Sequence, residues 1–227
     1  MPHVSRRTFL ELAGAAMVSG CGGGKNSFAP GSAPLLAFSD IHFNPFYTND
    51  QKVFQALDAS DVSQWQGLFE ASGVTAPSLW GADTNYPLLK LALASLRQNL
   101  GASQVAIYTG DLLGHDIADL YQQASGSSDQ ARMVAFTDKT AAFVMQQIRA
   151  AVGSIPVLFA VGNCDSYTGY GPDSTFLANN AQTFYTQMLN GAASQADFMS
   201  SFETVGNYAV ELVGGAVMLI CMNTMLC

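Results

Sequence analysis

Three short runs of consecutive apolar residues constrain the fold of this chain more than any other feature. They occupy residues 35–38, 105–108 and 157–161, and each ends in a group of polar residues. A strand with one solvated face alternates apolar and polar residues, whereas a strand that is covered on both faces is a continuous apolar run. The three runs therefore predict strands that are buried on both faces of one sheet.

The segments between and after these strands have helical periodicity. Leucines recur every three or four residues through 89–100, and a second apolar stripe runs through 136–151. A third helix is expected to open at Pro172 and Asp173, because proline fits the first turn of a helix and a carboxylate favours its N-terminus. The core-facing stripe of that helix consists of Leu177, Ala181, Phe184 and Met188.

Two more apolar runs lie near the end of the chain, at 208–213 and 216–220, on either side of Gly214-Gly215. Glycines adopt the positive φ angles of tight hairpin turns, so this pattern predicts a β-hairpin. Strands that alternate with helices define the α/β fold class, and we expect one domain over 34–227.

The composition is that of a globular protein, with 49% hydrophobic and 11% charged residues among 227 and a formal net charge of −8 at pH 7. A surface this acidic repels the phosphate backbone of nucleic acids, so no nucleic acid binding is expected. If such a protein handles phosphate, we expect metal cations to offset the repulsion.

The first twenty residues predict an export signal. Arg6 and Arg7 belong to a twin-arginine pattern, and the apolar stretch 10–18 that follows is too short to span a bilayer. Cys21 ends a sequence that resembles a bacterial lipobox and is predicted to carry a lipid anchor, and 21–33 form a flexible tether. The protein is thus expected on the periplasmic or extracellular face of a membrane. The alternative is an ordinary amphipathic helix followed by a glycine-rich loop.

The polar groups at the three strand ends are the candidate functional residues, because open α/β sheets hold their sites there. In the first group, Asp40 and His42 point to one side if the extended geometry continues, and they could then chelate one cation. The alternative is a hydrogen-bonded pair within a loop.

The second and third groups offer further oxygen ligands. The two carboxylate oxygens of Asp111 can bridge two cations, although the same residue is also suited to cap a helix. Asn163 offers a neutral carbonyl oxygen to a hard cation, although Gly162-Asn163 also suits a turn. Three such groups in one sheet favour a metal site over unrelated turns.

The three groups resemble a known family in their order and spacing. Asp40-x-His42, Gly110-Asp111-x-x-x-His115-Asp116 and Gly162-Asn163-x-Asp165 are similar to the first three motifs of the calcineurin-like metallophosphoesterases. The resemblance covers about 34–225 and is greatest to the acid sphingomyelinase-like phosphodiesterases and endopolyphosphatases. It implies a β-sandwich flanked by helices, with two divalent metal ions such as zinc, manganese or iron.

The resemblance also implies a role for each residue. Asp40 and His42 would hold the first metal, Asp111 would bridge both metals, and Asn163 would hold the second. His115, four residues after the bridging aspartate, would face the scissile phosphate and donate a proton to the leaving group. The substrate class is then a small-molecule or lipid phosphoester.

Two departures from the family pattern modify this expectation. Cys164 stands where the family usually has a histidine that contacts the phosphate, and it is a poor proton donor and a possible soft metal ligand. The chain has only three histidines, whereas the family's later motifs supply three further ligands. We therefore expect 34–227 to be the N-terminal part of a longer domain, with weak metal binding and little activity alone.

Two functions follow from these expectations. The first is a metal-dependent hydrolase of phosphodiester or phosphoanhydride bonds with a binuclear metal centre. The alternative is a non-catalytic exported lipoprotein that keeps the fold as a binding module, which Cys164 and the small number of histidines favour.

Overall fold

The computed structural model describes residues 34–48, 50–212 and 217–224. The predicted signal peptide, the tether, the lipid anchor Cys21 and the Gly214-Gly215 turn lie outside the described residues.

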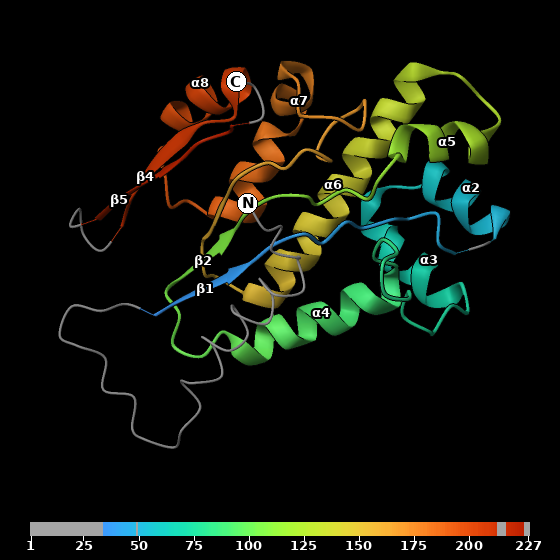
Figure 1. Ribbon diagram of the computed structural model, residues 1–227, viewed down its shortest axis with the longest axis horizontal. Helices are drawn as coiled ribbons and strands as arrows, with labels where there is room; N and C mark the ends of the chain where they lie inside the picture. Colours follow the sequence, from blue (N-terminus) through green and yellow to red (C-terminus); the bar gives the residue numbers. More distant parts are fainter. Residues whose placement is uncertain (1–33, 49, 213–216, 225–227) are drawn as a thin grey trace, which may run out of the picture. The chain divides into compact units, whose positions relative to one another are not determined.

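The three apolar runs form the parallel sheet that the sequence predicts. Strands β1 (Leu35–Phe38), β2 (Val105–Tyr108) and β3 (Val157–Phe159) lie in that order, with β2 in the middle. Figure 1 shows β1 and β2 side by side. β3 is entirely buried, and it ends two residues earlier than the apolar run. The carboxyl ends of parallel strands lie along one edge of a sheet, so the three polar groups that follow them start close together.

Strand β1 differs from the prediction of burial on both faces. Its residues alternate between exposed and partly buried, and the Leu35 side chain is 55% exposed. β1 pairs only with β2, which makes it the edge of the sheet within the described part of the chain. A continuous apolar run indicates that both faces of a strand could be buried, but the described residues cover only the face of β1 that carries Leu36 and Phe38.

The helices predicted from apolar stripes correspond to α4, α6 and α7, and the third continues into a π-helical turn, η2, that buries Met188. Within the described residues, four other α-helices and one short 3₁₀ helix were not predicted. In chain order the helical elements are α2 (Gln51–Ala59), η1 (Val62–Gln64), α3 (Trp65–Ala71), α4 (Tyr86–Asn99), α5 (Ile117–Ser125), α6 (Gln130–Val152), α7 (Ser174–Phe184), η2 (Tyr185–Leu189) and α8 (Gln195–Val205).

Side-chain caps fix where these helices begin. The carboxylate of Asp129 accepts hydrogen bonds from the N–H groups of Ala131 and Arg132 at the start of α6. Asp173 does the same for Phe176 at the start of α7, which confirms the predicted opening of the third helix. Such caps satisfy amides that have no partner within the helix.

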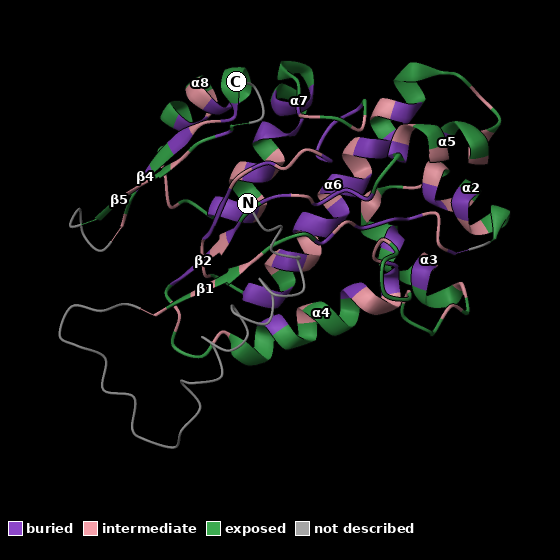
Figure 2. Cartoon of the chain, in the orientation of Figure 1, coloured by how far each residue is buried: buried purple, intermediate pink, exposed green. Residues whose placement is uncertain are grey.

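Helix α6 is the centre of the core and runs between α4 and α7 (Figure 1). Buried residues follow its length, whereas α4 is mostly exposed apart from Tyr86, Leu89 and Leu96 (Figure 2). Phe136 of α6 is fully buried, and four aromatic rings from other segments have centroids 5.2 to 5.6 Å from its own. α6 therefore joins segments that are far apart in the sequence.

The predicted hairpin forms from β4 (Tyr208–Leu212) and β5 (Val217–Cys221), which pair antiparallel as a second sheet. The Tyr208 hydroxyl donates a hydrogen bond to the carbonyl of Phe159 at 2.7 Å and accepts one from its N–H at 2.5 Å. This side chain attaches the hairpin to the end of β3.

The described residues thus form a mixed α/β fold with one parallel and one antiparallel sheet, which confirms the predicted class. Among these residues, none of the helices combines the length and apolar character that crossing a membrane requires.

Candidate metal centre

The chain segments that follow β1 and β2 remain side by side beyond the ends of the strands. The N–H of Asp40 donates to the carbonyl of Gly110 at 3.1 Å, and the N–H of His42 donates to the carbonyl of Asp111 at 2.9 Å. A third bond of 2.8 Å joins the N–H of Phe43 to the carbonyl of Leu112. The backbone itself therefore aligns the first two polar groups.

The backbone between these hydrogen bonds is not extended. The φ angles of Asp40, His42 and Asp111 are 56°, 45° and 64°, in the left-handed region that side-chain-bearing residues rarely adopt. The prediction that Asp40 and His42 share a side through extended geometry is therefore wrong. Residues held in such conformations cost free energy and concentrate at functional sites, where surrounding contacts maintain them.

The side chains of these three residues nevertheless converge. Nε2 of His42 lies 3.6 Å from Oδ1 of Asp40 and 3.7 Å from Oδ2 of Asp111, and one donor atom from each lies within 4.8 Å of the other two. Two carboxylates and an imidazole suit zinc, manganese or iron. The second ring nitrogen of His42, Nδ1, is buried and has no hydrogen-bond partner among the described residues.

The buried carboxylate of Asp165 holds the second and third groups together. Its Oδ1 accepts hydrogen bonds from the N–H groups of Leu112 and Leu113 at 2.8 and 3.2 Å. Its Oδ2 accepts from the N–H groups of Asp111 and Gly162 at 3.0 and 2.9 Å. Burial raises the pKa of Asp165 to about 6, and the backbone hydrogen bonds oppose that increase.

Two glycines let the loops after β2 and β3 approach this closely. A Cβ atom on Gly110, whose φ is 105°, would lie 2.5 Å from the backbone nitrogen of Gly162. A Cβ atom on Gly162 would lie 2.1 Å from Oδ1 of Asp111. No side chain fits at either position without moving the donor groups apart.

Asn163 and Cys164 lie beside the bridging candidate Asp111. The N–H of Cys164 donates to Oδ1 of Asp111 at 2.9 Å, and Nδ2 of Asn163 donates to Sγ of Cys164 at 3.3 Å. The Asn163 side chain is thus next to the cluster, with Sγ as its hydrogen-bond acceptor. Burial and then the Asp111 carboxylate raise the pKa of the Cys164 thiol to about 12, so the thiol is protonated at neutral pH.

His115 lies against His42, with ring centroids 4.6 Å apart and planes inclined by 12°. Its side chain is 61% exposed, as a group that meets a substrate needs to be. Its Nδ1 lies 2.6 Å from Oδ1 of Asp83, whose Oδ2 accepts the His115 N–H at 2.9 Å. Nδ2 of Asn44 also donates to that Oδ2, at 3.1 Å. Asp83 therefore fixes the ring with Nε2 as the available nitrogen.

Asp83 was not predicted as a site residue, and Asn44 had no predicted role. Asp83 lies in a stretch between α3 and α4 that has neither a strand nor a helical period, so no pattern distinguished it. The backbone explains its position, because the N–H of Thr84 donates to the carbonyl of His42 and the N–H of Asn44 donates to the carbonyl of Thr84, both at 2.8 Å.

The alternative role of Asp111 as a helix cap is excluded. Helix α5 begins at Ile117, and its N-cap residue is Asp116, whose side chain makes no capping hydrogen bond. Asp116 also has a positive φ of 54°. His115 and Asp116 both lie in the segment between β2 and α5.

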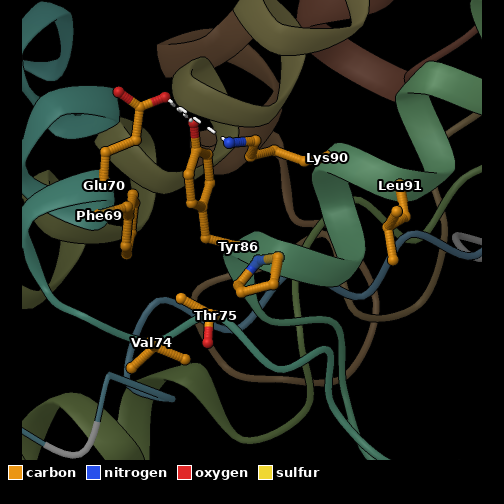
Figure 3. A pocket seen from close by; sticks show the side chains of 8 residues that line it. Phe69, Glu70, Val74, Thr75, Tyr86, Lys90 and Leu91 are labelled. Carbon is orange, nitrogen blue, oxygen red and sulfur yellow. Dashed lines mark hydrogen bonds and ion pairs between the residues drawn. The ribbon is translucent and has the colours of Figure 1, made fainter.

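A separate cavity of about 410 Å³ lies between α3 and α4 (Figure 3). Its charged groups satisfy one another, because Oε1 of Glu70 accepts the Tyr86 hydroxyl at 3.1 Å and lies 3.9 Å from Nζ of Lys90. Burial, followed by the Glu70 carboxylate, raises the pKa of Tyr86. These groups show no unpaired ligand for a metal or a phosphate, unlike those at the strand ends.

Comparison of the chain with protein-family models and with curated proteins gives no match.

Asp165→Asn is expected to lower the free energy of unfolding by at least about 2 kcal/mol, because each carboxylate oxygen accepts two N–H groups and either orientation of the amide turns an NH₂ toward two donors. Urea denaturation followed by circular dichroism measures the change. Asp173→Asn keeps its cap and is expected to cost little. Equal losses in the two variants would show that the four hydrogen bonds of Asp165 stabilise the fold no more than the cap made by Asp173 does.

Proposed function

We propose that the chain is part of a metal-dependent hydrolase of phosphodiester or phosphoanhydride bonds. The observation that carries this proposal is the convergence of Asp40, His42 and Asp111 at the ends of two neighbouring parallel strands, on backbone in the left-handed region. The two carboxylates place negative charge on either side of one imidazole nitrogen, and a cation bound between them would offset their mutual repulsion.

The donor set fits divalent metal ions. Asp40 and His42 would hold the first ion, Asp111 would contact two ions through its two oxygens, and Asn163 would hold the second. Divalent ions in such a site supply Lewis acidity toward a phosphoryl oxygen and toward water. The expected fold is the helix-flanked β-sandwich of the calcineurin-like metallophosphoesterases, to which both sheets would contribute.

The chain's own residues supply positioning and a proton. The proposed role of His115 is to donate the Nε2 proton of its imidazolium form to the leaving-group oxygen, while Nδ1–H stays on the Asp83 carboxylate; the exposure of the side chain suits this role. Asp83 is the proposed positioning residue, because its carboxylate holds both the Nδ1 atom and the backbone N–H of His115. The candidate substrates are small-molecule and lipid phosphoesters.

The second candidate function is a non-catalytic binding module. The observation that favours it is Cys164, a buried and protonated thiol at the position of the family's phosphate-contacting histidine. Turnover of any phosphoester by the purified protein would exclude this candidate.

In the assay with manganese, the enzyme of which this chain is proposed to be part is expected to hydrolyse bis-p-nitrophenyl phosphate only when the metal is present. Asp111→Asn should lower kcat by at least about 100-fold, because one change affects ligands of both ions, whereas Cys164→Ala should have a much smaller effect. Release of nitrophenolate measures both rates. Metal-independent turnover, or equal losses in the two variants, would contradict the assignment.

Asp83→Asn tests the role of His115 through the leaving group. Phenyl esters need a proton from the enzyme more than nitrophenyl esters do, so the variant should lose about tenfold or more in kcat with a methyl phenyl phosphodiester and less with the nitrophenyl analogue. Asp58→Asn, which removes the partner of Arg132 instead, is the matched control. Equal losses with both esters would mean that Asp83 acts only on stability.

We also propose that the protein is exported and attached to a membrane through lipidated Cys21, a proposal that rests on the sequence alone. Mass spectrometry of protein expressed in a bacterium with a twin-arginine pathway should find Cys21 at the mature N-terminus with a diacylglyceryl group. The Cys21→Ser variant should lack this modification. An unmodified N-terminus at Met1 or Gly22 in the unsubstituted protein would refute the anchor.

A further inference from the structure

A second group of possible ligands lies beside the first and includes sulfur. Donor atoms of His42, His115 and Cys164 all lie within 4.8 Å of one another. The three residues come from the loops after β1, β2 and β3, so the same backbone contacts that align the carboxylates also bring them together. The group shares His42 with the oxygen-rich set but contains no carboxylate.

The hydrogen bonds around this group leave its donor atoms available. Nδ1 of His115 is engaged by Asp83, so Nε2 is the nitrogen that remains for a ligand. A carboxylate that binds the far nitrogen of a metal-bound imidazole is the usual outer contact of histidine ligands. Nδ1 of His42 has no hydrogen-bond partner among the described residues. Sγ of Cys164 accepts a hydrogen bond from Nδ2 of Asn163 at 3.3 Å. Because burial and the Asp111 carboxylate favour the protonated thiol, the metal ion itself has to displace the proton.

We propose that His42, His115 and Cys164 form a site for a thiophilic metal ion, such as zinc, distinct in its chemistry from the carboxylate-rich site of the proposed hydrolase. Thiolate and imidazole ligands select soft and borderline ions, whereas carboxylates select manganese and magnesium. Binding replaces the thiol proton of Cys164 with the metal ion, and the proton passes to water; no electron is transferred.

Occupation of this site has a consequence for the proposed reaction. The bound ion takes Nε2 of His115, the same atom that the proposed proton transfer needs. A thiophilic ion should therefore inhibit the manganese-supported hydrolysis, and Cys164→Ser should relieve that inhibition. This expected inhibition rests on the proposed hydrolase function, whereas metal binding by the three residues does not.

The test uses Co²⁺ as the probe, because a thiolate bound to Co²⁺ gives a near-ultraviolet charge-transfer band that oxygen and nitrogen ligands do not give. The 227-residue chain should develop this band on titration with Co²⁺. A variant in which Cys21, Cys221 and Cys227 are all serine should keep the band, and Cys164→Ser should lose it. An absent band in the unsubstituted chain, or a band that Cys164→Ser retains, would overturn the proposal.

The histidines are tested by affinity rather than by the presence of the band. Asp83→Asn and His115→Gln should each weaken Co²⁺ binding about 10–100-fold, the range seen for contacts that orient a ligand. His115 is an exposed side chain, so its variant should fold even if Cys164→Ser does not, and circular dichroism checks both. Unchanged affinity in His115→Gln would show that the sulfur binds without it and would overturn the three-residue site.

The absorbance test does not depend on turnover. The proposal of a thiophilic site can therefore be refuted without refuting the proposed hydrolase, and the reverse is also true. A protein that hydrolyses phosphodiesters with manganese but gives no sulfur band lacks the thiophilic site. A protein that gives the band but no hydrolysis has the site without the proposed enzyme activity.

Discussion

The hydrogen bonds of the Asp165 carboxylate are the interaction on which the candidate site depends. One buried side chain accepts four backbone N–H groups from two loops that are about fifty residues apart in the sequence. The hydrogen bonds that one carboxylate accepts from several amides offset much of the free energy that is lost when the carboxylate is removed from water. The loops after β2 and β3 are therefore fixed relative to each other before any ligand binds.

The strands of the parallel sheet could be predicted because buried strands consist of short continuous runs of apolar residues. Apolar runs and helical stripes gave the three parallel strands, the hairpin and the helices α4, α6 and α7. Helices α2, α3 and α5 escaped because they have only 9, 7 and 9 residues, so an apolar stripe has too few turns in which to repeat. Helix α8 was also missed, although with 11 residues it is as long as α7. The exposure of β1 also escaped, since a strand's sequence does not say whether anything covers it.

The sequence predicted which side chains converge better than it predicted the backbone geometry that brings them together. Asp40, His42 and Asp111 converge as expected, yet by left-handed backbone and not by the alternation of an extended strand. Asp83 could not be found, because its contact with His115 depends on how the stretch before α4 pairs with the loop after β1. Such pairings between distant segments leave no local trace in the sequence.

Backbone hydrogen bonds set the spacing of the loops at the candidate site, whereas the side chains that point into it determine which ligands it could bind. Gly110, Gly162 and the buried Asp165 set the spacing of the three loops, and none of them needs to touch a ligand. The side chains at positions 42, 111, 115 and 164 can then change identity while the cradle remains. A substitution at a position such as 164 would then change the groups that line the site without requiring the scaffold to refold.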